Sequence, residues 1–219
     1  MTTDRDTVPG VRRRAGERDT LLRPEWRYIE PCNMDDYSAE DWAVMNRQRE
    51  DYLAQERAKQ ALELLSASRD APTFGYLINN YEHCLQTATL LYRDGHDEDT
   101  IVAGLFHDIG FIVCPENHPS FAADLLRPFV SEKNIWMIER HEVFQRIHLH
   151  GCFKPEDPEF INAREQWRGH PYFDWTAEFV ERYDIVAINP DVESLPIEFF
   201  EPMVRRVFSG SRSLPGRSR

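Results

Sequence analysis

A histidine and an aspartate close an apolar run in the middle of the chain. His107 and Asp108 directly follow IVAGLF at residues 101–106, a run that should form a buried helix. An aspartate is rarely fully buried unless it is paired or binds a metal ion. This pair is therefore the first candidate for chemistry.

Three more histidines and a second aspartate fall within or beside apolar helical segments. In chain order, the candidate metal ligands are His83, His107, Asp108, His118, His141 and Asp184. Imidazole and carboxylate groups together are ligands for iron, manganese or zinc, and helix bundles build such sites from ligands on separate helices. A purely structural interpretation would require each of these six polar groups to find its own buried partner. The set therefore favours a metal site.

The segments that carry these residues read as helices. Residues 39–68 have apolar residues at roughly helical spacing and no Gly or Pro, which predicts one long amphipathic helix. Further helices are expected at 76–93, from Asp97 or Asp99 to Gly110, at 118–129, from Ser131 to near Gly151, at 172–189 and at 197–208. No alternating run predicts a strand. The expected fold class is all-α, a compact multi-helix domain with a long additional N-terminal helix.

Composition limits the classes of partner. The 219 residues carry 26 Lys and Arg against 38 Asp and Glu, a net charge of −12, which disfavours binding to nucleic acid or to an anionic membrane. No apolar stretch is long enough to cross a bilayer, and the N-terminus is charged where a signal peptide would be apolar, so we expect a cytoplasmic protein. The four cysteines, with no CxxC pair, are expected to be reduced.

The composition also predicts the domain boundaries. Residues 1–24 and 209–219 are polar, basic and without periodicity, and we expect disordered tails. Residues 25–72 form a helical extension in this interpretation, and residues 73–208 form the metal-binding domain. The long helix could also pair two copies, so a monomer and a homodimer both remain open.

The order of the candidate ligands resembles the HD-domain superfamily of metal-dependent proteins. Within it, the chain is most similar to the HD-domain phosphonate oxygenases and myo-inositol oxygenase. The segments that carry this similarity are YEHCLQTATLLYRDGHDEDTIVAGLFHDIG at 81–110, HPSFAADLLRPF at 118–129, ERH at 139–141, RYD at 182–184 and LPIEFFEPMVRRVF at 195–208. The similarity covers roughly residues 73–208. HD alone is a weak motif, whereas four histidines and two aspartates in this order are much more specific.

The resemblance implies a di-iron centre. One iron would have the ligands His83, His107, Asp108 and Asp184, and the other would have His118, His141 and Asp108. Asp108 would bridge them, which suits a carboxylate because its two oxygens can serve two cations. The implied reaction uses O2 at an Fe(II)/Fe(III) centre to cleave a C–C or C–P bond in a small hydroxylated substrate.

Two positions depart from this pattern. Residues 73–76 read Thr-Phe-Gly-Tyr, where the phosphonate oxygenases have a stretch resembling Tyr-x-Gly-Glu that gates an iron. Gln145 stands where that family has a Lys that helps to hold the phosphonate, and a neutral amide cannot neutralise a dianion. Phosphonate recognition is therefore weakened as a specific expectation.

Helical spacing suggests which residues contact the substrate. His141, Gln145 and His148 share one face of the expected helix, and Tyr76 would lie two turns before His83. We therefore predict that Tyr76, Gln145 and His148 bind substrate, and that Gln145→Ala alters substrate binding while metal content stays intact.

The main alternative is an HD-domain phosphohydrolase that acts on a nucleotide or phosphate ester. Phe111 follows HDIG where many such enzymes have Lys, and no Lys or Arg occurs between Arg93 and Arg127, although phosphate sites usually contain fixed cations. Arg140 and Arg146 remain candidate donors. A regulatory protein with a degenerate site is a third alternative, disfavoured by the complete ligand set.

Overall fold

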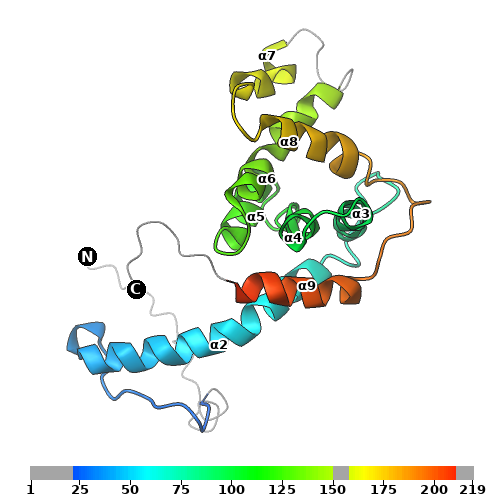
Figure 1. Cartoon of the computed structure of the whole chain (residues 1–219). Helices are drawn as coiled ribbons and strands as arrows, with labels where there is room; N and C mark the ends of the chain where they lie inside the picture. The colour runs from blue at the N-terminus through cyan, green and yellow to red at the C-terminus, as the bar shows by residue number, and fades with distance from the viewer. Residues whose placement is uncertain (1–21, 150–157, 211–219) are drawn as a thin grey trace, which may run out of the picture. The chain divides into compact units, whose positions relative to one another are not determined.

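The computed structural model describes residues 22–149 and 158–210, and all regular secondary structure in these ranges is helical (Figure 1). The predicted all-α class is therefore confirmed. The predicted tails lie almost wholly outside the described residues, as do Gly151, the expected end of one helix, and Cys152.

The α-helices are α2 (Ala39–Ser66), α3 (Asn80–Arg93), α4 (Glu98–Phe106), α5 (His118–Leu126), α6 (Glu132–Gln145), α7 (Pro158–Ile161), α8 (Phe173–Phe179) and α9 (Ile197–Ser209). Short 3-10 turns are η2 (Met34–Asp36), η3 (Pro115–Asn117), η4 (Arg146–His148) and η5 (Ala163–Trp167), and η6 (Val180–Asp184) is a π-helical turn. None of the described helices is sufficiently long and apolar to span a membrane.

The chain divides into two compact units, residues 1–53 and 54–219, with the boundary inside α2. In the described part of the first unit, the backbone N–H of Arg27 donates to Gln48 Oε1 at 2.7 Å, and the rings of Trp26 and Tyr52 meet edge to face. No residue from 22 to 53 is buried. These two contacts hold Trp26 and Arg27 against α2, but the described residues of this unit form no hydrophobic core.

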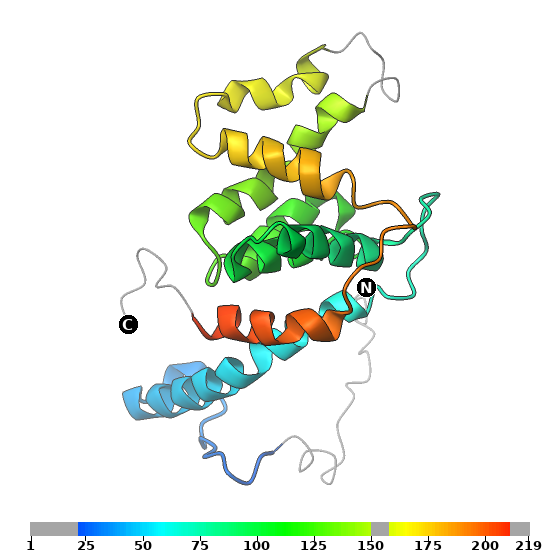
Figure 2. The same cartoon turned by 45° about the vertical axis from the view of Figure 1, so that its right-hand side comes forward.

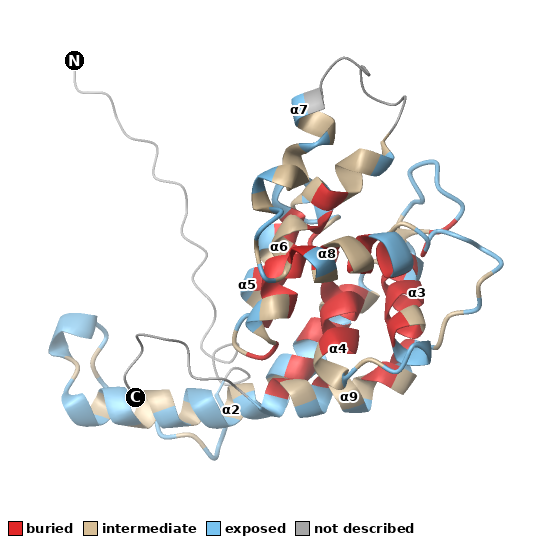
Figure 3. Cartoon of the chain, turned by 45° about the horizontal axis from the view of Figure 1, so that its top comes forward, coloured by how far each residue is buried: buried red, intermediate tan, exposed pale blue. Residues whose placement is uncertain are grey.

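In the second unit, α3 and α4 pack together, as do α5 and α6, with α4 also in contact with α6. In Figure 2, α8 in gold lies on one side of these green helices, and α9 in orange and red lies on the other. Figure 3 shows that α3 and α4 are mostly buried. The rings of Phe129 and Phe208 stack at 4.3 Å, which ties α9 to the turn that follows α5. The core thus surrounds α3, which carries His83, and α4, which His107 and Asp108 directly follow.

Capping residues define the helices that carry the candidate ligands. Asn79 accepts a hydrogen bond from the Glu82 backbone N–H and starts α3, and Asp97 accepts one from Thr100 and starts α4. The prediction that the first of these helices begins at residue 76 was wrong. Gly75 has a φ of 101°, a left-handed backbone conformation that interrupts a helix, and Asn79 supplies the cap four residues later.

Two further helix predictions need correction. The segment 172–189 is not one helix, because α8 ends at Phe179 and continues as the π-turn η6 to Asp184. The helix expected to reach Gly151 ends at Gln145 and tightens into the 3-10 turn η4. Helical turns at residues 158–167 were not predicted.

Candidate metal centre

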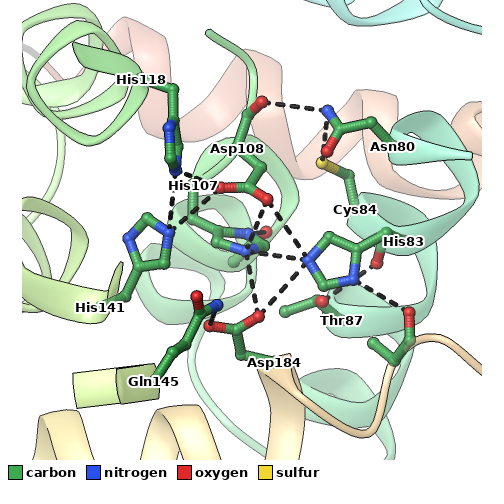
Figure 4. A network of polar contacts seen from close by, with 12 residues as sticks. Asn80, His83, Cys84, Thr87, His107, Asp108, His118, His141, Gln145 and Asp184 are labelled. Atoms are coloured by element: carbon green, nitrogen blue, oxygen red, sulfur yellow. Dashed lines mark hydrogen bonds and ion pairs between the residues drawn. The ribbon is translucent and has the colours of Figure 1, made fainter. Parts of the chain in front are cut away.

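The six predicted ligands converge in the core of the second unit (Figure 4). His83 lies on α3, His107 and Asp108 follow the last turn of α4, and His118 begins α5. α6 provides His141, and Asp184 ends the π-turn η6. None of the six is more than 9% exposed. Polar groups from five segments are thus gathered where water has little access.

The first group of ligand atoms surrounds one oxygen of Asp184. Its Oδ1 lies 3.5 Å from His83 Nε2 and 3.7 Å from His107 Nε2. The two Nε2 atoms are 3.1 Å apart. Ligand atoms that share one ion at about 2.1 Å are roughly 3 to 4 Å from one another. These three side chains therefore have the spacing of a metal pocket.

The second group surrounds one oxygen of Asp108. Its Oδ1 lies 3.1 Å from His141 Nε2 and 3.2 Å from His118 Nε2. The other oxygen, Oδ2, lies 3.6 Å from His83 Nε2 and 3.8 Å from His107 Nε2. The two oxygens of Asp108 therefore face the two pairs of histidines separately.

Every histidine of the cluster is oriented by a backbone carbonyl. The Nδ1–H groups of His83, His107, His118 and His141 donate to the carbonyls of Ala187, Gly104, Pro115 and Ile138, at 2.7 to 2.9 Å. A neutral imidazole that donates from Nδ1 carries its lone pair on Nε2. All four lone pairs consequently point into the cluster, which is the common arrangement of metal-binding histidines.

The cluster fits a bound cation better than a network of hydrogen bonds. His83 and His107 bring Nε2 atoms to 3.1 Å, and His118 and His141 bring theirs to 3.4 Å. With Nδ1–H donated outward, the lone pairs of each close pair of Nε2 atoms repel unless an added proton or a metal ion lies between them. A cation between each pair would turn this repulsion into coordination, so imidazole and carboxylate donors here suit a transition metal.

The electrostatics keep both carboxylates charged. Burial raises the pKa of Asp108, but His107, His118 and His141 outweigh burial and hold the pKa well below its ordinary value. For Asp184, burial is likewise outweighed, chiefly by His107, and the pKa is lowered. Burial tends to lower the pKa of His107, yet Asp108 and Asp184 raise it to about 9. Both carboxylates are therefore in the form that binds cations.

The three predicted substrate residues lie in different surroundings. Gln145 reaches the cluster, where its amide Nε2 donates to Asp184 Oδ2 at 2.8 Å. Tyr76 is 60% exposed and lies in the loop before α3, and His148 is exposed on η4. Tyr76 and His148 were chosen because helical spacing would place them near the ligands. However, α3 begins at Asn80 and α6 ends at Gln145, so neither Tyr76 nor His148 lies on these helices. Their role in substrate binding stays a prediction.

Some supporting residues were not predicted. Asn80 donates its side-chain amide to the backbone carbonyl of Asp108 at 3.0 Å, which fixes the turn after α4. Gln86 donates to the carbonyls of Asn189 and Val192 and holds the segment whose Ala187 carbonyl orients His83. Helix-facing Asn and Gln residues give no distinctive signal in a sequence, so only the fold reveals these contacts.

Comparison with known families gives one match, which covers part of the chain. The HD domain family model matches residues 80–167, a range that includes five of the six clustered residues and ends before Asp184. No curated protein matches the chain. Members of the HD domain family are generally metal-dependent enzymes, and the clustered His and Asp residues are the candidate ligands. An HD domain is therefore present at residues 80–167.

Proposed function

We propose that the protein is a non-haem di-iron oxygenase that uses O2 to cleave a C–C or C–P bond in a small hydroxylated substrate. His83, His107, Asp108 and Asp184 would hold one iron, and His118, His141 and Asp108 would hold the other. Two bound irons would supply the activation of O2 and the redox chemistry with the substrate.

The position of Asp108 carries this proposal. Its Oδ1 faces His118 and His141, and its Oδ2 faces His83 and His107, at 3.1 to 3.8 Å. One carboxylate can therefore serve two ions and fix their separation. The histidines keep their orientation through the backbone carbonyls, so the pockets are preorganised by the fold.

The surroundings favour an oxygenase over a phosphohydrolase. Within residues 22–149 and 158–210, no Lys or Arg side chain forms an ion pair or hydrogen bond with the six clustered residues. Arg140 instead pairs with Glu139 and lies over Trp136, and Arg146 lies over Phe160. A phosphate ester usually requires fixed cationic donors beside the metals.

The test begins with metal analysis of the whole chain purified without chelators. We expect two irons per chain and, after partial reduction, the electron paramagnetic resonance signal of a coupled mixed-valence pair. The iron-loaded protein is then screened for O2 consumption with small hydroxylated substrates, and for hydrolysis of generic phosphate esters. Substrate-dependent O2 consumption is the expected result.

A matched pair of variants separates the centre from the fold. Asp108→Asn removes the proposed bridging charge and should abolish the coupled signal and O2 consumption, whereas Asp174→Asn makes the same change at an exposed site on α8 and should preserve both. Manganese, magnesium or zinc in place of iron, together with phosphate-ester hydrolysis lost in Asp108→Asn, would instead establish the hydrolase.

A further inference from the structure

The two oxygens of Asp184 have different partners. Oδ1 faces His83 Nε2 at 3.5 Å and His107 Nε2 at 3.7 Å. Oδ2 accepts a hydrogen bond from Gln145 Nε2 at 2.8 Å (Figure 4). Only one oxygen of this carboxylate is therefore directed at the proposed iron pocket, and the other is occupied by an amide.

A carboxylate can bind an ion through one oxygen or through both, and the difference is a rotation of the group. The side chain of Asp184 is 2% exposed, so water has almost no access to Oδ2 in place of Gln145. The hydrogen bond from Gln145 therefore opposes the rotation that would bring Oδ2 toward the ion. It also satisfies a buried anionic oxygen, which is costly to leave without a partner.

We propose that Gln145 is a positioning residue that keeps Asp184 bound to the metal through one oxygen. This inference rests on the metal pockets of the proposed function, but it requires neither iron nor oxygenase activity. It assigns Gln145 a role beyond the predicted substrate contact.

The place of Gln145 on α6 explains why an amide suits this role. His141 lies one helical turn earlier on α6 and belongs to the other pocket, so one rigid helix carries a ligand for one ion and a support for the other. A neutral amide donates to the carboxylate without adding a positive charge that would compete with the bound cation. α6 thereby fixes both pockets relative to one another.

Titration of the metal-free whole chain with Co(II) tests the proposal, because the visible absorption of Co(II) reports its coordination number. The titration compares wild type, Gln145→Ala and Gln145→Met, and the same changes in a His118→Ala background that isolates the pocket of Asp184. Gln145→Met keeps most of the side-chain volume but removes the donor. Gln60→Ala, at an exposed position of α2, is the matched control.

We expect both Gln145 variants to bind Co(II) about 10- to 100-fold more weakly in the Asp184 pocket, as is typical when a ligand loses its supporting hydrogen bond. Absorption per ion should also fall in that pocket, because Asp184 would bind through both oxygens and raise the coordination number. The pocket of His118 and His141 should keep its affinity, and Gln60→Ala should match wild type.

Unchanged affinity and absorption in both Gln145 variants would overturn the proposal. Equal weakening of both pockets with a lowered Tm would also overturn it, because that result indicates a general packing role. Normal Co(II) behaviour without O2 consumption by the iron-loaded wild type would contradict the oxygenase but not this inference. No Co(II) binding by wild type would contradict both.

Discussion

His83 and His107 bring their Nε2 atoms to 3.1 Å while each donates its Nδ1–H to a backbone carbonyl. If both rings are neutral, their lone pairs meet inside the core, an arrangement that is unfavourable without a proton or a metal ion between them. His118 and His141 repeat the arrangement at 3.4 Å. The stability of this core should consequently depend on bound metal.

Metal removal should lower the stability of the whole chain. A ligand that binds only the folded state adds about 2.7 kcal/mol at 100 times its Kd. For a chain of this size, that is a rise in Tm of roughly 5 to 10 °C. Calorimetry of chelator-treated protein with and without added Fe(II) or Co(II) measures the effect. A Tm that does not respond to either metal would argue that the cluster binds none.

The two pockets should load in a fixed order. The pocket with His83, His107 and Asp184 also faces Asp108 Oδ2 and so has four protein donors, whereas the other has three. Calorimetric titration should show two sites, with the four-donor pocket the tighter.

Ligand variants should identify these sites. Asp184→Ala should remove the tight site, His141→Ala the weak site, and Asp108→Ala should impair both. His148→Ala replaces an exposed histidine beyond the end of α6 and should still bind two ions. Loss of both ions in every ligand variant would contradict two separable pockets.

Gly110 should be required for the position of His118. A Cβ at residue 110 would lie 3.0 Å from the Cα of His118 and 3.0 Å from the Cβ of Phe121, closer than packed atoms normally come. Gly110→Ala should therefore displace the start of α5, cost about 1 to 3 kcal/mol of unfolding free energy and weaken the pocket of His118. Urea denaturation and metal titration measure the two effects.

Gly169 provides the control for this substitution, since a Cβ there would meet nothing within 4 Å. Gly169→Ala should leave both measurements close to wild type. If Gly110→Ala bound two ions with wild-type affinity, the close approach to His118 would have no role in the site.

The cap of α4 should contribute a pH-dependent part of stability. Asp97 Oδ1 accepts a hydrogen bond from the Thr100 backbone N–H at 2.9 Å. Burial raises the pKa of Asp97, but the hydrogen bonds from Thr100 outweigh burial and lower it. Because the folded pKa is lowered, the contribution is complete above the unfolded value of about 3.9 and is lost as the pH falls through the folded value.

Urea unfolding of the metal-free chain tests this cap. Asp97→Ala should cost about 1 kcal/mol at pH 7, and its difference from wild type should shrink near pH 3. Asp97→Asn keeps a capping oxygen without the charge, so its difference from Asp97→Ala should persist at low pH. If the free energies of unfolding of wild type and Asp97→Ala differed by the same amount at both pH values, the carboxylate charge would add nothing to the cap.

The helices and the identity of the clustered residues could be predicted from the sequence. Apolar periodicity and the absence of breakers predicted α2, and of the two predicted candidates Asp97 and Asp99, Asp97 caps α4. Four histidines and two aspartates in apolar settings are hard to explain as separate structural residues, so they could be selected before their proximity was known. His96 and His170 lie outside the cluster, where they contact Tyr183 and Trp136.

Only the tertiary structure decided how these side chains are directed. Helical spacing placed Tyr76 and His148 beside the ligands. Tyr76 is not on α3, because Gly75 interrupts the helix and Asn79 caps its start. His148 is not on α6, because the 3-10 turn η4 follows Gln145. The π-turn before Asp184 and the hydrogen bond from Gln145 to its Oδ2 depend on the packing of α6, α8 and η6. Local sequence determines which face of a helix is apolar, whereas the direction of a buried polar group depends on partners distant in the chain.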